Sequence, residues 1–174
     1  GHSIEARLYA EDPDNDFLPE TGTLIAFEED YEAEARWDSG VESGSIVGTS
    51  FDPMLAKVIS YGATRTDAAT KLARALEAAH IGGLTTNRDF LVATLKTQEF
   101  LDGDTTTDFI DRVKPPRALV LSDEQIKHVT AIAALWIQEL NRLHDDVLGH
   151  LPSGWTNGRT PSCLLYTSPS PRDY

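Results

Sequence analysis

The chain has 174 residues, of which 40% are hydrophobic and 25% are charged, so it is long and apolar enough to bury a core of its own. Its formal net charge of -13 argues against nucleic-acid or anionic-membrane partners, which need clustered Lys and Arg, and no stretch approaches the roughly 20 apolar residues of a membrane span. The single cysteine, Cys163, excludes an internal disulfide, and no histidine pair has metal-ligand spacing, so no metal site is expected.

The amino-terminal segment is the first predicted element. Apolar and polar residues alternate from residue 4 to residue 10, which is the period of a half-buried strand. This alternation places Glu5, Arg7 and Tyr9 on one face of the strand. The residues before it include neither a start methionine nor the regions of a signal peptide, so we expect the chain to begin within a longer protein. The cytoplasm is the default expectation for the location of that protein.

Two further strands are predicted before the middle of the chain. Residues 30–38 alternate again and end at a turn. Residues 54–60 are apolar except for Lys57, a pattern that a short helix shares, and we favour a buried strand. Residues 44–50 superficially resemble a phosphate loop, but they lack its lysine and open no helix, so a hairpin turn is expected there.

Helices are predicted in the second half of the chain, where three segments open with a capping box. In this pattern a Ser or Thr is followed three residues later by an acidic or amide residue, and an amphipathic run comes next. Glycines at 82 and 83 are expected to end the first helix. The three boxes are Thr64 with Asp67, Thr86 with Asp89, and Ser122 with Gln125.

The third helix follows a proline-containing linker at residues 114–116 and has a wide apolar stripe. A stripe of this width needs a partner surface, so we predict that Trp136 and Leu140 cover only part of their apolar area in this chain alone. Its members are Ile126, Val129, Ile132, Trp136, Leu140, Leu143 and Val147.

Strands followed by helices, without strict alternation, indicate an α+β fold. We predict a domain at residues 1–112 and a linker with a long amphipathic helix at 113–161. Residues 162–174 resemble translated sequencing-adapter read-through, are rich in Ser and Pro, and are expected to be disordered.

The sequence gives little indication of a hydrolase or of a cation-binding site. No G-x-S-x-G nucleophile elbow occurs, which sets a hydrolase aside. The acidic residues between Glu28 and Glu34 could attract a cation, but such runs are usually solvated faces. A noncatalytic α+β interaction domain therefore stays open as an interpretation of the pattern alone.

A resemblance to a known family is carried by several segments that occur in order along the chain. They are residues 1–13, 17–19 with 22, 38–41, 44, 51–59, 83–87 and 103–110. Together these segments closely resemble the C-terminal domain of biotin carboxylase, part of an ATP-grasp enzyme, which implies a small, mainly antiparallel sheet with packed helices. The segment at residues 122–155 is similar to the connection in acyl-CoA carboxylase alpha subunits, which favours that type over pyruvate or urea carboxylase.

This resemblance implies a ligase that uses ATP, Mg²⁺ and bicarbonate to carboxylate biotin held on a carrier. The ATP-grasp residues and the biotinyl-lysine motif are absent from this chain, so the chain alone should be inactive. The implied partners are the missing ATP-grasp and biotin-carrier regions, a carboxyltransferase beta subunit and a second copy of the chain in a homodimer.

Four residues match positions to which the family gives a role. Arg7 matches the arginine that contacts bicarbonate and biotin, although the residues alone would indicate an ordinary cross-strand ion pair. Asp52 matches an aspartate near the biotin pocket that could pair with Arg7, or it is a turn residue before proline. Thr107 matches a position near the adenine of ATP. Arg36 matches a dimer-interface position, but Ala33 replaces the aromatic residue expected three positions earlier.

Overall fold

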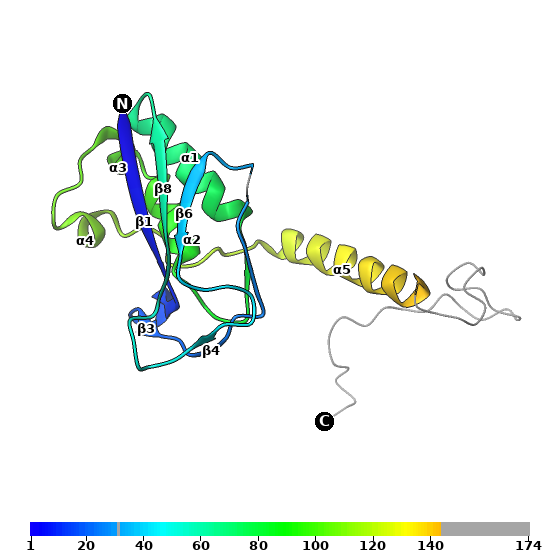
Figure 1. Ribbon diagram of the computed structural model, residues 1–174. Coiled ribbons are helices and arrows are strands. Elements are labelled where there is room, and N and C mark those ends of the chain that lie inside the picture. Colours follow the sequence, from blue (N-terminus) through cyan, green and yellow to red (C-terminus); the bar gives the residue numbers. More distant parts are fainter. Residues whose placement is uncertain (31, 144–174) are drawn as a thin grey trace, which may run out of the picture. The chain divides into compact units, whose positions relative to one another are not determined.

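The computed structural model describes residues 1–30 and 32–143 of the chain (Figure 1). The chain divides into two compact units, residues 1–119 and residues 120–174. The predicted boundary at residue 161 and the segment 162–174 lie outside the described residues.

The first unit is built on a three-stranded antiparallel sheet in which β8 lies between β1 and β6 (Figure 1). The other strands form three short antiparallel pairs, β2 with β3, β4 with β7 and β5 with β9. The strands are β1 (His2–Tyr9), β2 (Glu11–Asp12), β3 (Leu18–Pro19), β4 (Gly22–Thr23), β5 (Ala26–Glu28), β6 (Ala35–Ser39), β7 (Ile46–Val47), β8 (Met54–Gly62) and β9 (His80–Gly82).

Four helices follow the long strands in this unit, and a 3₁₀ turn (Pro13–Asn15) follows β2. Helix α1 packs on one face of the three-stranded sheet, where its Leu72 and Leu76 join Ala6 of β1 and Val58 of β8 in a buried cluster. The opposite face of that sheet is more exposed. The predicted α+β fold is confirmed. The helices are α1 (Arg65–Ala78), α2 (Arg88–Leu95), α3 (Gln98–Asp102) and α4 (Phe109–Val113).

A second buried cluster lies where the carboxyl end of β1 meets the short strand pairs. Leu8, Leu24 and Leu55 are fully or almost fully buried there, and Phe27 packs beside them. The ring of Trp37 meets that of Phe27 edge to face with centroids 6.2 Å apart, and Trp37 packs against both clusters. The two clusters therefore form one continuous support beneath the sheet.

The turn after β2 has an unusual backbone that the end of the first unit stabilises. Asp16 and Phe17 have φ values of 51° and 58°, which non-glycine residues adopt only at a cost. Arg117 donates from Nη1 to the Pro13 carbonyl at 2.8 Å and to Asp16 Oδ1 at 3.1 Å. The Phe17 ring contacts Phe90 edge to face at 5.0 Å. These contacts offset the strain of the turn.

The predicted strands agree with the structure at two of three places. β1 and β8 are present, so the strand interpretation of residues 54–60 is confirmed. The strand predicted from residue 30 starts only at Ala35, as β6. The Asp30 carboxylate accepts from the Glu32 amide at 3.0 Å and the Asp30 carbonyl from the Ala33 amide, which makes a turn instead.

Two of the three capping boxes form as predicted. Thr64 Oγ1 accepts from the Asp67 amide at 3.1 Å, and Ser122 with Gln125 bond reciprocally at 3.3 and 2.8 Å. The third prediction was wrong, because α2 has Asn87 as its N-cap without a side-chain capping bond. The side chain of Asn87 bonds to β1 instead.

Two turn predictions also need correction. Helix α1 ends at Ala78, before the glycines, because residues 80–82 pair with β5 as strand β9. Residues 44–50 do lie in the connection between the antiparallel strands β6 and β8, but they form no tight hairpin turn, because Ile46 and Val47 pair with β4 as strand β7. In both places a distant strand supplies hydrogen bonds that the local pattern does not indicate.

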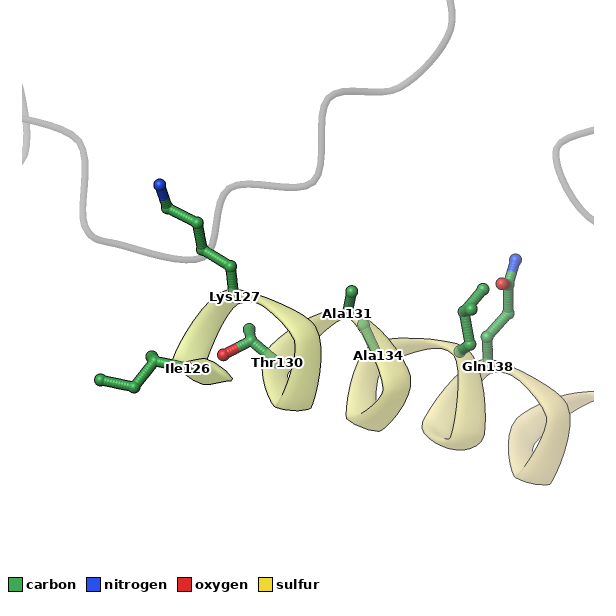
Figure 2. A pocket seen from close by; sticks show the side chains of 7 residues that line it. Ile126, Lys127, Thr130, Ala131, Ala134 and Gln138 are labelled. Carbon is green, nitrogen blue, oxygen red and sulfur yellow. The ribbon is translucent and has the colours of Figure 1, made fainter. Parts of the chain in front are cut away.

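The second unit contains helix α5 (Asp123–Leu143). Trp136 is 67% exposed and Leu140 is 39% exposed, so the predicted partial covering in this chain alone is confirmed. Val147 lies outside the described residues. None of the described helices combines the length and apolarity that a membrane-crossing helix needs. An apolar pocket lies along α5 (Figure 2), and the described residues that line it all belong to this helix.

Candidate functional site

Arg7 lies on the exposed face of the three-stranded sheet because strand alternation directs its neighbours Ala6 and Leu8 into the core. Its Nε donates to Glu5 Oε1 at 3.2 Å, and its side chain is 62% exposed. Hydrogen bonding by Glu5, and next by Tyr9, raises the pKa of Arg7 above its ordinary value. The predicted shared face of Glu5, Arg7 and Tyr9 is therefore confirmed, and the guanidinium is charged and accessible.

A row of charged side chains crosses the sheet beside Arg7. In the strand register Arg7 is opposite Lys57 of β8, and Lys57 is opposite Asp38 of β6. Lys57 Nζ lies 3.4 Å from Asp38 Oδ2. Arg36 binds the same carboxylate through two nitrogens, at 2.9 and 2.7 Å. Hydrogen bonding by Arg36 is the first cause that holds the pKa of Asp38 below its usual range.

Asn87 attaches helix α2 to the free edge of β1 next to Arg7. Its side-chain nitrogen donates to the Arg7 carbonyl at 3.2 Å, and its side-chain oxygen accepts from the Tyr9 amide at 2.9 Å. The Asn87 amide also donates to the Tyr9 carbonyl at 3.1 Å. This arrangement imitates a neighbouring strand, so the backbone that carries Arg7 is held from both sides.

Asp52 does not pair with Arg7, contrary to the pairing that we considered. The Asp52 carboxylate accepts from the Met54 amide at 3.2 Å, as a turn residue does, while Arg7 bonds to Glu5. Asp52 lies near Glu11, whose pKa is raised first by burial and then by the Asp52 charge. Asp52 also lines a hollow near β7 and the start of β8, and Arg7 is not among the described residues that line it.

The other two predicted site residues lie elsewhere on the first unit. Thr107 is exposed in the connection between α3 and α4, where the neighbouring Thr106 hydroxyl bonds to Asp108. Arg36 is exposed on the edge strand β6, where its bond to Asp38 orients its guanidinium. The structure thus brings Arg36 onto the sheet face that carries Arg7 but leaves Thr107 on a separate loop.

The acidic run at residues 28–34 does not gather into a metal site. No group of three or more potential metal ligands occurs within residues 1–30 and 32–143. Several of the acidic side chains have other partners. Glu29 accepts from the Ser39 hydroxyl, and Glu34 pairs with Lys71.

The family model for the biotin carboxylase C-terminal domain matches residues 5–112 of the chain. The chain belongs to this family. Biotin carboxylase 2 of Bacillus subtilis is 43% identical over 110 residues, which are 63% of this chain and 24% of the relative. The mitochondrial methylcrotonoyl-CoA carboxylase subunit alpha of Arabidopsis thaliana is 33% identical over 166 residues, 89% of this chain and 23% of the relative.

Solved structures agree with this assignment. The biotin carboxylase domain dimer of Hydrogenobacter thermophilus 2-oxoglutarate carboxylase, in complex with MgADP, ADP and bicarbonate, has a TM-score of 0.62 at 28% identity. The match covers 64% of this chain and 25% of that one. Pyruvate and urea carboxylases are among the other similar structures. The chain spans between 16% and 24% of the length of the curated relatives that it matches.

Two residues beside Arg7 were missed from the sequence. Lys57 is the one charged residue in an otherwise apolar predicted strand. Strand alternation places a charged residue at that position on the solvent-facing side of β8, and this is the signal that could have identified it. In the sequence, Asn87 is an unassigned position between Thr86 and Asp89, the two residues of the predicted capping box. No local signal shows that its amide bonds to β1, because its partners lie 78 and 80 residues away.

Proposed function

We propose that this chain forms one side of the biotin carboxylase active site in an acyl-CoA carboxylase alpha subunit. The observation that carries the proposal is the accessible, oriented Arg7 on the open face of the sheet, in a chain that belongs to the biotin carboxylase C-terminal domain family. The complete enzyme would be a ligase that uses ATP and bicarbonate to carboxylate carrier-bound biotin.

Arg7 has the chemistry that this reaction requires. Deprotonation of biotin places negative charge on its ureido oxygen, and a cation already in position stabilises that charge more in the transition state than in the ground state. The guanidinium stays charged and presents donors in a planar fork, which suits bicarbonate or a ureido oxygen. The bond to Glu5 uses Nε, so the terminal nitrogens can serve as those donors.

The cofactors of the proposed enzyme are biotin, ATP and Mg²⁺. Biotin, when bound, supplies the ureido nitrogen that accepts the carboxyl group. Arg7 fits the anionic part of this chemistry, and bicarbonate in the similar Hydrogenobacter structure supports such a role. For ATP this chain offers Thr107, which we infer to lie near the adenine. The residues that hold the phosphates and Mg²⁺ are proposed to lie in other regions of the complete enzyme.

Asp52 and Arg36 have supporting roles in the proposal. In this proposal Asp52, in the turn before β8, forms part of the wall of the biotin pocket and makes no ion pair with Arg7. Arg36 contributes to a homodimer interface from the edge strand β6, and the dimeric Hydrogenobacter domain supports that arrangement.

The acyl-CoA type is favoured over pyruvate or urea carboxylase by how far the similarity extends. The match to the Arabidopsis methylcrotonoyl-CoA carboxylase subunit covers 89% of the chain, whereas the matches to the solved pyruvate and urea carboxylase structures cover 70% and 63%. The proposed partners are the ATP-grasp and biotin-carrier regions and a carboxyltransferase beta subunit. We further infer a role in fatty acid metabolism and a location in the cytoplasm. Fractionation of the source cells tests the location.

The proposal is tested by complementation. The 174-residue chain is supplied to a biotin carboxylase that lacks its own C-terminal domain, and bicarbonate-dependent ATP cleavage is measured with free biotin. We expect the chain to restore activity and Arg7→Ala to lower kcat by roughly a hundredfold, as the loss of one transition-state donor does elsewhere. Arg74→Ala is the matched control, because Arg74 is an exposed arginine on α1, and it should retain the restored rate.

Either of two results would contradict the proposal. In one, the chain binds the truncated enzyme but restores no biotin-dependent ATP cleavage. In the other, Arg7→Ala and Arg74→Ala behave alike, which would leave the chain a structural part of the enzyme with no role for Arg7 in the reaction.

A further inference from the structure

The exposed face of the three-stranded sheet has an excess of positive charge in an otherwise acidic chain. The chain has a formal net charge of -13. On this face the strands carry three cations, Arg7, Lys57 and Arg36, and two carboxylates, Glu5 and Asp38. One positive charge is therefore not balanced by an acidic residue of the same strands.

The uncompensated charge belongs to Lys57 and Arg36, which share the Asp38 carboxylate, whereas Arg7 is paired with Glu5. Lys57 is the member of this pair that lies opposite Arg7. Arg7 and Lys57 are direct cross-strand partners, and like charges in that arrangement destabilise a sheet. Lys57 shares its carboxylate with Arg36, which holds Asp38 through two bonds of 2.9 and 2.7 Å, while Lys57 lies 3.4 Å away. Lys57 is also 37% exposed in its side chain, so its ammonium can reach a ligand on this face.

An oxyanion beside both cations would remove this repulsion. Arg7 offers a planar fork of donors, and Lys57 offers a compact charge with three donors on a flexible stem. A carboxylate-sized anion that bonds to the guanidinium can accept from the ammonium as well, since directly opposed residues have Cβ atoms about 5 Å apart. The pair therefore fits a small anion better than either residue alone.

We propose that Lys57 is a second anion-binding residue, which holds bicarbonate together with Arg7 on the open face of the sheet. This inference rests on the proposed biotin carboxylase function and extends it to a residue in the neighbouring strand. Lys57 contributes to ground-state binding of the anion, and Arg7 also stabilises the charge that develops on biotin. Substitution of Lys57 should accordingly change KM for bicarbonate more than kcat.

The experiment compares Lys57→Met with Lys71→Met. Both lysines pair with carboxylates, but Lys71 extends from α1 and bonds to Glu34 and Asp67. The first measurement follows the arginine Nε–H NMR signals of the 174-residue chain during titration with sodium bicarbonate, with sodium chloride at equal ionic strength as a reference. The second measures KM for bicarbonate and for ATP in the complemented enzyme.

We expect Lys57→Met to raise the bicarbonate Kd and KM by roughly tenfold, the size expected for one partly exposed charge at short range. KM for ATP should stay unchanged, and Lys57→Arg should restore bicarbonate binding to within about threefold of the original, because it keeps the charge. Thermal unfolding of each variant separates this loss from a folding defect, and Lys57→Arg gives the answer if Lys57→Met does not fold.

The outcomes separate this inference from the proposed function. If Lys57→Met and Lys71→Met bind bicarbonate equally while Arg7→Ala abolishes activity, Lys57 is not an anion ligand and the proposed function stands. If Arg7→Ala leaves activity intact, the proposed function fails. In that case the NMR titration still decides whether Arg7 and Lys57 bind an anion. A parallel titration with phosphate shows whether the pair prefers another oxyanion. Tighter binding of phosphate than of bicarbonate would overturn the assignment of bicarbonate.

Discussion

Gly83→Ala is expected to lower the free energy of unfolding by about 4 kcal/mol, because it combines backbone strain with a clash against main-chain atoms. Gly83 has φ +105°, a region that residues with a Cβ rarely adopt. An added Cβ would lie 2.3 Å from the Thr23 carbonyl oxygen and 2.7 Å from the Ile25 amide nitrogen. Neither atom can move freely, since Ile25 donates to the Gly82 carbonyl at 2.9 Å.

Gly44→Ala is the matched control for this prediction. Gly44 also has a positive φ, +92°, but an added Cβ would meet nothing within 4 Å. Gly44→Ala should therefore lower the free energy of unfolding by only about 1 kcal/mol, which is the contribution of the unfavourable backbone conformation alone. Urea unfolding of the three proteins, followed by circular dichroism, measures both losses. Equal losses for the two alanine variants would show that the close approach of residues 83 and 23–25 is not a constraint on the fold.

Asn87→Ala is expected to lower the free energy of unfolding by about 3 kcal/mol. Asn87 is only 6% exposed, and the substitution removes the side-chain partners of the Arg7 carbonyl and the Tyr9 amide together. Leaving partly buried backbone groups without partners costs roughly 1–3 kcal/mol for each group. Asn15→Ala is the control, because Asn15 is exposed at the end of the 3₁₀ turn, and its loss should be much smaller.

Hydrogen exchange gives this prediction a local readout. The Tyr9 amide should exchange faster in Asn87→Ala than in the unsubstituted chain, by more than the change in global stability explains. Because the same contact holds the backbone of Arg7, the variant should also lose bicarbonate-dependent activity in the complemented enzyme. Unchanged protection of the Tyr9 amide would mean that Asn87 does not hold the edge of β1.

The two faces of the three-stranded sheet have different roles, and this difference determines how the candidate site is organised. One face packs Ala6 and Val58 against α1, so it is committed to stability. The other keeps Arg7 and Lys57 accessible without opening the core. This arrangement suits the proposed role as one side of an active site, since the functional groups would then meet residues supplied by other regions of the enzyme.

The candidate site could be predicted from the sequence only in part. Arg7 was identified by resemblance, and strand alternation placed it correctly with Glu5 and Tyr9. The pairing considered for Asp52 was wrong, because a carboxylate before proline finds a nearer donor in the Met54 amide than in a side chain of another strand. The roles of Asp52, Thr107 and Arg36 stay predictions.

By itself the sequence determined those features that depend on neighbours within a few residues. Strand alternation in β1, the capping bonds of Thr64 and of Ser122 with Gln125, and the α+β order of elements are of this kind. Only the tertiary structure decided which strands pair. It placed Lys57 opposite Arg7, 50 positions along the chain, and it directed the Asn87 side chain to the edge of β1. Local patterns indicate which backbone and charged groups need a hydrogen-bonding or ion-pair partner. Which partner a strand edge or a charged side chain finds depends on how distant segments pack.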